Sequence, residues 1–418
     1  MSPISYLLEY NRIYNILGIF VILAIAVGMS HNRSRISWRL VITALCLHSI
    51  IAFFVLKTVS GRAIIGSIAG GFTLLYQASD AGIHFVFGNL AHMDGPWGFI
   101  FAIKVLPVII FFGAFMAMLF YLRIVQSIVM GINYVIRPLL GTTGPETLCA
   151  IANSFLGQTE APLLIKHYLK EMTKSEFLVM MISGMGTISG SLLAVFAVMG
   201  IPAVHLLAAS VMAIPATILI AKIIYPETEE STAMLKANAD YDMHAGNVLD
   251  AISQGTSDGL WLALNVGAML ISFLALLGMV NGLLYFTSTQ INALFGLNLP
   301  LITLNKIFAW ICLPFAWLLG FGGAEATQVG QLIGTKIAVN ELVAYTDMLK
   351  MNLSPRTLSI VTYALCGFSN FSCIGMQIGG IGSLVPEKRK WISSFGVKAV
   401  FGAALANLLS AMVASLLL

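Results

Sequence analysis

Charged residues are scarce in this sequence. Of 418 residues, 22 are Lys or Arg and 18 are Asp or Glu, which is 10% of the chain. Soluble globular domains carry roughly 25% charged residues. Apolar residues make up 58%, and the mean hydropathy is +0.91. This composition excludes an ordinary soluble protein and is typical of a polytopic membrane protein built from helices.

Three other features are missing. The net charge is only +4 and the basic residues form no long run, which argues against a nucleic-acid partner. The five cysteines lie within apolar stretches without CxxC spacing, so we interpret them as small core residues rather than disulfides or metal ligands. No glycine-rich phosphate loop follows a strand, so an ion gradient is a simpler energy source than ATP.

Eight apolar runs are long enough to cross a membrane as helices. The first is followed by Arg33, Arg35 and Arg39, so we expect a retained helix rather than a signal peptide, with its N-terminus outside. Residues 58–90 and 124–141 are expected to lie at the interface or against the bundle. The predicted spans are 13–29, 39–56, 98–121, 177–199, 203–224, 260–287, 357–381 and 392–417.

Segments 143–172 and 301–346 are too polar in the middle to be plain spans, and each has glycine beside a glutamate. Helical runs broken at membrane depth predict re-entrant hairpins whose tips line a protein cavity. Thr143 with Glu146, and Thr173 with Glu176, have capping-box spacing, which marks helix starts at the beginning of the first segment and directly after it.

Each predicted hairpin is followed by an interrupted span, near 183–190 and 367–373, and then by a plain span. The pattern therefore predicts an all-α membrane protein with about eight transmembrane helices and two re-entrant hairpins in an inverted repeat, with its binding site where the broken segments meet. The expected parts are a scaffold (1–141), a first repeat (142–225), a cytoplasmic loop with a scaffold helix (226–298), and a second repeat (299–418).

Glu160 and Glu325 lie in the two hairpin segments, where a carboxylate costs about 2.5 to 3.5 kcal/mol on insertion scales. The alternative is that each is a structural partner of a nearby Lys or Arg. Gln158 and Thr159 add an amide and a hydroxyl beside Glu160. This set suits an uncharged solute that makes several hydrogen bonds.

Neutral oxygens are available for a hard cation such as sodium. Asn153 and Thr187 supply side-chain oxygens, and unwound backbone at Leu156 and Ile188 supplies carbonyls. Taken alone, Asn153 is equally well explained as a hydrogen bond between helices.

The second interruption carries Asn370 next to Phe368. Phe368 fits a core position, but a flat aromatic beside an amide can also stack on a planar ring. Lys336, Asn340 and Glu341 follow the tip expected for the second hairpin, and we interpret them as structural, with an internal ion pair that holds the hairpin.

Several motifs together resemble the concentrative nucleoside transporter family in its short bacterial form. They are HFVFG at 84–88, GQTEAP at 157–162, NVGAMLI at 265–271, GTK at 334–336 with NELVAY at 340–345, and ALCGFSN at 364–370. The resemblance implies eight spans with two re-entrant hairpins, a homotrimer, and a transport part that moves against a scaffold.

The resemblance also implies roles for individual residues. The base would contact Gln158, Thr159 and Glu160, and the ribose Glu325 and Asn370, with Leu192 and Phe368 lining the site. Sodium would bind Asn153, Thr187 and the carbonyls of Leu156 and Ile188. Cys373 stands where a ribose-contacting Ser is expected, and a thiol is a weaker hydrogen-bond partner.

With this resemblance, the expected function is that of an inner-membrane symporter, not an enzyme, that imports uridine-like or purine nucleosides with sodium. Three alternatives remain open at this level. Proton coupling would use Glu160 as the carrier, an intramembrane enzyme would use Glu160 and Glu325 as acid and base, and a passive channel would show no accumulation.

Overall fold

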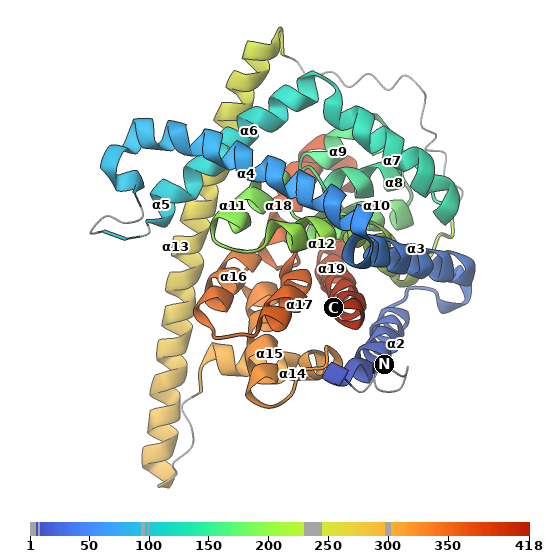
Figure 1. The fold of residues 1–418 in the computed structure, drawn as a ribbon. Helices are drawn as coiled ribbons and strands as arrows, with labels where there is room; N and C mark the ends of the chain where they lie inside the picture. The colour runs from blue at the N-terminus through green and yellow to red at the C-terminus, as the bar shows by residue number, and fades with distance from the viewer. Residues whose placement is uncertain (1–5, 7–8, 93–96, 99, 230–244, 297–301) are drawn as a thin grey trace.

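The computed structural model describes residues 6, 9–92, 97–98, 100–229, 245–296 and 302–418. Within these residues every regular element is a helix, which confirms the predicted all-α class (Figure 1). Most of the expected cytoplasmic loop, 230–244, lies outside the described residues, as does residue 301 at the start of the second predicted hairpin. The helices are α2 (Arg12–Gly28), α3 (Trp38–Lys57), α4 (Val59–Phe87), α5 (Phe101–Lys104), α6 (Leu106–Tyr121), α7 (Ile124–Leu140), α8 (Gly144–Asn153), α9 (Ala161–Leu164), α10 (Lys174–Gly186), α11 (Gly190–Val198), α12 (Ala203–Ile224), α13 (Val248–Phe295), α14 (Leu304–Leu318), α15 (Gly323–Ala338), α16 (Glu341–Lys350), α17 (Pro355–Leu365), α18 (Ser372–Leu384) and α19 (Arg389–Leu417).

Among the described residues, eight helical segments are long and apolar enough to cross a membrane. Seven coincide with predicted spans. The eighth, Val59–Ala91, covers the segment expected at the interface, and in Figure 1 its helix α4 runs crosswise to α13. The predicted span 357–381 does not qualify, because its break leaves two short helices, α17 and α18.

The spans form a buried core and an exposed outer group. The apolar windows of α10–α11, α12 and α19 are 100%, 94% and 83% buried, whereas that of α13 is 6% buried. An apolar surface of this extent is unsuited to water and suits contact with lipid. The three buried spans lie within the residue ranges predicted for the repeats, and α13 lies within the range predicted for the scaffold helix.

Helices α6 and α13 cross closely, at one edge of the molecule in Figure 1. A Cβ atom added to Gly113 would lie 2.7 Å from the Gly255 carbonyl oxygen, and one on Gly259 would lie 2.8 Å from the Ile110 Cα. Small residues let helix backbones approach in this way in membranes. The two helices are thus packed closely against each other, beside the repeats.

The first hairpin begins as predicted. Both capping boxes are formed: the Thr143 amide donates to Glu146 at 2.9 Å, and the Thr173 amide donates to Glu176 at 2.8 Å. Helix α8 then ends at Asn153, the chain turns without regular helix, and the short helix α9 returns.

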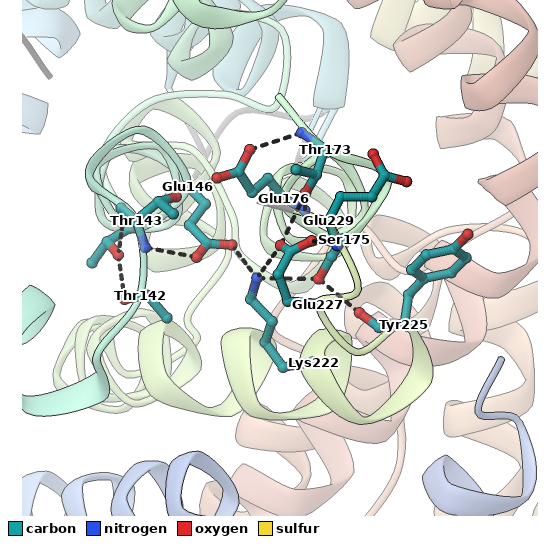
Figure 2. Close-up of polar contacts among 11 residues, drawn as sticks. Thr142, Thr143, Glu146, Thr173, Ser175, Glu176, Lys222, Tyr225, Glu227 and Glu229 are labelled. Carbon is teal, nitrogen blue, oxygen red and sulfur yellow. Dashed lines mark hydrogen bonds and ion pairs between the residues drawn. The ribbon is translucent and has the colours of Figure 1, made fainter. Parts of the chain in front are cut away.

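A buried charge cluster anchors the base of this hairpin (Figure 2). Lys222 of α12 lies 2.8 Å from Glu146 at the start of α8 and 3.3 Å from Glu227, and its ammonium donates to Ser175 at 3.1 Å. Thr173 also donates to Glu227, at 2.9 Å. Removing one member of a buried pair leaves an uncompensated charge. The cluster therefore fixes α8 and α10 to the end of α12.

The two predicted interruptions are present, between α10 and α11 and between α17 and α18. Asn407 of α19 joins them, because its amide nitrogen donates to the carbonyls of Gly186 at 2.7 Å and Cys366 at 2.8 Å. Gly367 has φ 150°, and a Cβ there would lie 2.6 Å from the Asn407 side-chain oxygen. The breaks of the two repeats therefore meet in the core.

Candidate functional site

A cavity of about 410 Å³ lies where the first hairpin tip, both helix breaks and α13 converge. It contains seven of the eight residues predicted to contact the substrate, namely Gln158, Thr159, Glu160, Leu192, Phe368, Asn370 and Cys373. The prediction did not include Gly157, Ser189, Leu262, Asn265, Val266, Leu270, Asn340, Glu341, Leu342, Ser372 and Met376 as lining residues.

The tip of the first hairpin holds its carboxylate by a local contact. The Gly157 amide donates to Glu160 at 3.2 Å. In the described part of the chain no Lys or Arg forms an ion pair with Glu160. The alternative of a structural ion pair is thus without support at this glutamate, and the carboxylate faces the cavity.

Glu325 does not reach the cavity. It is half-buried near the start of α15, where the Thr357 hydroxyl donates to it at 2.5 Å. The glycine-rich bend before it packs against the N-terminal region, because Asn11 donates to the Gly320 carbonyl at 3.2 Å. The expectation that this bend is the counterpart of the first hairpin tip is therefore corrected.

The second cavity carboxylate is Glu341. It lies at the other end of α15 from Glu325, and sixteen residues at the helical rise amount to about 24 Å. Helix α15 ends at Ala338 and α16 begins at Glu341, so α15 and α16 form the hairpin that reaches the cavity. Glu160 and Glu341 each stand where the returning arm of a hairpin begins. The inverted repeat thus pairs these two glutamates.

Glu341 is held with Asn370 in a short polar chain. The Asn370 amide nitrogen donates to Glu341 at 3.1 Å, and its oxygen accepts from the Ser372 hydroxyl at 2.6 Å and from the Cys373 amide at 3.2 Å. Glu341 and Asn370 are 5% and 1% exposed. The cavity therefore offers a fixed carboxylate and amide suited to vicinal hydroxyl groups.

Lys336 and Asn340 have structural contacts, as predicted, but the expected ion pair is not among those of the described residues. Lys336 donates instead to the Ala364 carbonyl at 2.8 Å and to Asn407 at 2.7 Å. Asn340 caps α16 by accepting from the Val343 amide at 2.9 Å. The Glu341 carboxylate therefore lines the cavity without an ion pair to Lys336.

The residues predicted to bind sodium come together in the first repeat. The Asn153 side-chain nitrogen donates to the Ser183 hydroxyl at 2.9 Å, and the Thr187 hydroxyl donates to the backbone carbonyl of Asn153 at 2.8 Å. Leu156 and Ile188 are buried in the adjoining non-helical backbone. The Asn153 side-chain oxygen is buried without a hydrogen-bond partner, which is an uncommon and costly situation for a polar atom.

A second cavity of about 400 Å³ lies on the other side of the hairpin tip, against α6 and α13. Thr159, Glu160 and Ser189 line both cavities, and Asp258 of α13 lines the second. The first hairpin tip therefore lies between two cavities, one among the repeats and one facing the outer helices.

Family descriptions match nearly the whole chain. The Na+ dependent nucleoside transporter N-terminus matches residues 17–90, and the C-terminus of the same family matches residues 205–415. Between them, a nucleoside recognition gate domain matches residues 102–203, which include the first hairpin.

Three relatives show the range of the similarity. An uncharacterized transporter of Haemophilus influenzae is 43% identical over 96% of this chain and 97% of its own length. The nucleoside permease NupC of Helicobacter pylori is 38% identical, with 97% and 98% covered. The sodium/nucleoside cotransporter 1 of Rattus norvegicus is 35% identical over 97% of this chain, which spans 64% of the rat protein.

Solved structures agree with the fold. The structure of CNTnw in an inward-facing substrate-bound state is 36% identical, with a TM-score of 0.90 and 97% of each chain covered. A CNTnw variant in an outward-facing state has a TM-score of 0.90 at 35% identity. These relatives are transporters and not enzymes, and the chain belongs to the concentrative, Na+-dependent nucleoside transporter family.

Proposed function

We propose that this nucleoside transporter couples inward movement of a nucleoside to entry of sodium across the cytoplasmic membrane. The observation that carries the sodium part is the Asn153 side-chain oxygen, which is buried and unpartnered next to Thr187. Neutral oxygens of amides, hydroxyls and unwound backbone are suitable ligands for a hard cation in a membrane. The relatives named as sodium-dependent transporters support the same ion.

The position of this oxygen connects ion binding to the hairpin. Asn153 ends α8, directly before the tip that carries Gln158 and Glu160. A cation bound to Asn153, Thr187 and the carbonyls of Leu156 and Ile188 would order this non-helical backbone. Ordering the tip favours nucleoside binding, and reciprocity requires that nucleoside raise sodium affinity by the same factor.

For the substrate we propose two groups of contacts. Gln158, Thr159 and Glu160 face the base, with Leu192 and Phe368 supplying apolar walls. Asn370 faces the ribose hydroxyls, and Glu341 takes the role expected of Glu325 because it is the carboxylate beside Asn370. Uridine-like and purine nucleosides both have a base and ribose hydroxyls that can make these contacts.

Transport is proposed to proceed by movement of the repeats past the outer helices. One sodium charge crossing a potential of about 100 mV supplies roughly 2.3 kcal/mol, and the sodium concentration gradient adds to this. Relatives solved in outward-facing and inward-facing states support alternating access. Assembly as a homotrimer and location in the inner membrane are proposed from the family resemblance.

The experiment is uptake of labelled uridine into proteoliposomes, with sodium replaced by choline at fixed pH. Without sodium, we expect uridine uptake to fall to background. With sodium, we expect the uridine concentration inside the vesicles to exceed the external concentration. Uptake that is unchanged in choline but responds to a pH gradient would favour proton coupling through Glu160. Sodium-independent uptake in which the internal uridine concentration only reaches the external concentration would indicate a passive channel.

A further inference from the structure

Gln377 of α18 is fully buried and lies behind the cavity, linking both repeats. Its amide nitrogen donates to the Met181 carbonyl of α10 at 3.1 Å and to the Gln158 side-chain oxygen at 3.1 Å. The Gln377 side chain does not line the cavity. Among the described residues, the Gln377 side chain forms a hydrogen bond with one cavity-lining side chain, that of Gln158.

These contacts determine the direction of both amides. A backbone carbonyl can only accept, so the end of Gln377 that faces Met181 must be its NH₂ group. The second hydrogen of that group points at Gln158, so the facing atom of Gln158 must be its oxygen. The Gln158 side-chain nitrogen then points the other way, and its neighbour there is the sulfur of Met376, at 3.6 Å. Met376 lines the cavity.

Gly184 gives the two glutamines the space for this arrangement. A Cβ at this position would lie 3.0 Å from the Gln158 Cβ and 3.1 Å from the Gln377 nitrogen. A thioether is a weak acceptor, so the Gln158 N–H groups on the cavity side are poorly satisfied by Met376. A base that presents a better acceptor there gains a hydrogen bond.

We propose that Gln377 is a positioning residue that holds the Gln158 amide with its N–H groups toward the substrate, and so selects bases that present a carbonyl or ring-nitrogen acceptor. This inference rests on the proposed contact between Gln158 and the base. Without Gln377, the amide can rotate and offer its oxygen, which removes the preference for an acceptor.

The test measures binding of three ligands by isothermal titration calorimetry on purified protein with sodium. They are uridine and two analogues that lack, in turn, its 4-carbonyl and its 2-carbonyl. We expect the wild type to bind at least one analogue about tenfold more weakly than uridine. In Gln377→Met, which keeps the size and removes the donor, we expect uridine affinity to fall about five- to tenfold and that discrimination to shrink toward onefold.

A double-mutant cycle separates positioning from general packing. In a Gln158→Ala background, adding Gln377→Met should change uridine affinity less than twofold. Gln126→Met is the matched control, because Gln126 is also buried and donates to a backbone carbonyl, that of Phe120 at 2.8 Å, but does not line the cavity. It should keep wild-type affinity and discrimination. If Gln377→Met does not fold, Gln377→Asn replaces it in the same cycle.

Full discrimination in the Gln377 variant, additive losses in the cycle, or a wild type that ignores both carbonyls would each overturn the positioning role. A wild type that binds no nucleoside would instead overturn the proposed substrate site. The two failures are thus distinguishable.

Discussion

The Lys336 ammonium donates to the Asn407 side-chain oxygen at 2.7 Å, and both residues are about 1% exposed. The same ammonium donates to the Ala364 carbonyl at 2.8 Å, just before the break between α17 and α18. Because the Asn407 nitrogen binds carbonyls at both breaks, one cation and one amide hold the centre of the two repeats. The second repeat therefore has the Lys336 ammonium at its break, whereas the first repeat has the residues of the proposed sodium site at the equivalent place.

We expect Lys336→Met to destabilise the protein by about 2 to 4 kcal/mol, because it leaves buried acceptors unpaired. The change in stability is measured by heating the protein in detergent and monitoring the loss of monodisperse protein. Lys170→Met is the control, because Lys170 is 70% exposed and its ion pair with Glu387 is on the surface. Equal melting temperatures for the two variants would contradict the role of Lys336.

Glu341→Gln and Glu325→Gln distinguish the observed carboxylate from the one expected from the sequence. Losing the charge beside Asn370 should weaken uridine binding by about 1 to 3 kcal/mol. Glu325→Gln should change binding by less than about 0.5 kcal/mol, since that side chain contacts Thr357 away from the cavity. Titration calorimetry compares both with the wild type. A larger loss for Glu325→Gln would reverse the assignment.

The inverted repeat and its breaks were predictable from the sequence, because glycine and polar residues interrupt apolar runs there. The choice between Glu325 and Glu341 was not. Both lie beside helix breaks in the same segment, and which break faces the cavity depends on distant packing, such as that of the Gly320 bend against Asn11 and of Glu341 against Asn370. Asn407 and Gln377 were also missed, since a single amide within an apolar helix does not reveal its distant partners.

Asn153→Ala should raise the sodium concentration needed for half-maximal uptake by about fivefold or more, because it removes an oxygen with no other partner. Uridine affinity at saturating sodium should change less. The control is Asn133→Ala, which truncates another buried asparagine, on α7 outside both cavities. Sodium titration of uptake is the measurement. An unchanged sodium dependence in Asn153→Ala would remove this residue from the ion site.

Lys222 provides a test of whether the base of the first hairpin must be held for transport. Lys222→Met leaves Glu146, which is fully buried, without its ion partner, and breaking a buried pair costs about 3 to 5 kcal/mol. Lys222→Met combined with Glu146→Gln removes both charges, so it should recover much of the melting temperature. Uptake should remain low in this double variant, because α8 is no longer tied to α12. Recovery of stability and uptake together would show that the cluster only balances charge.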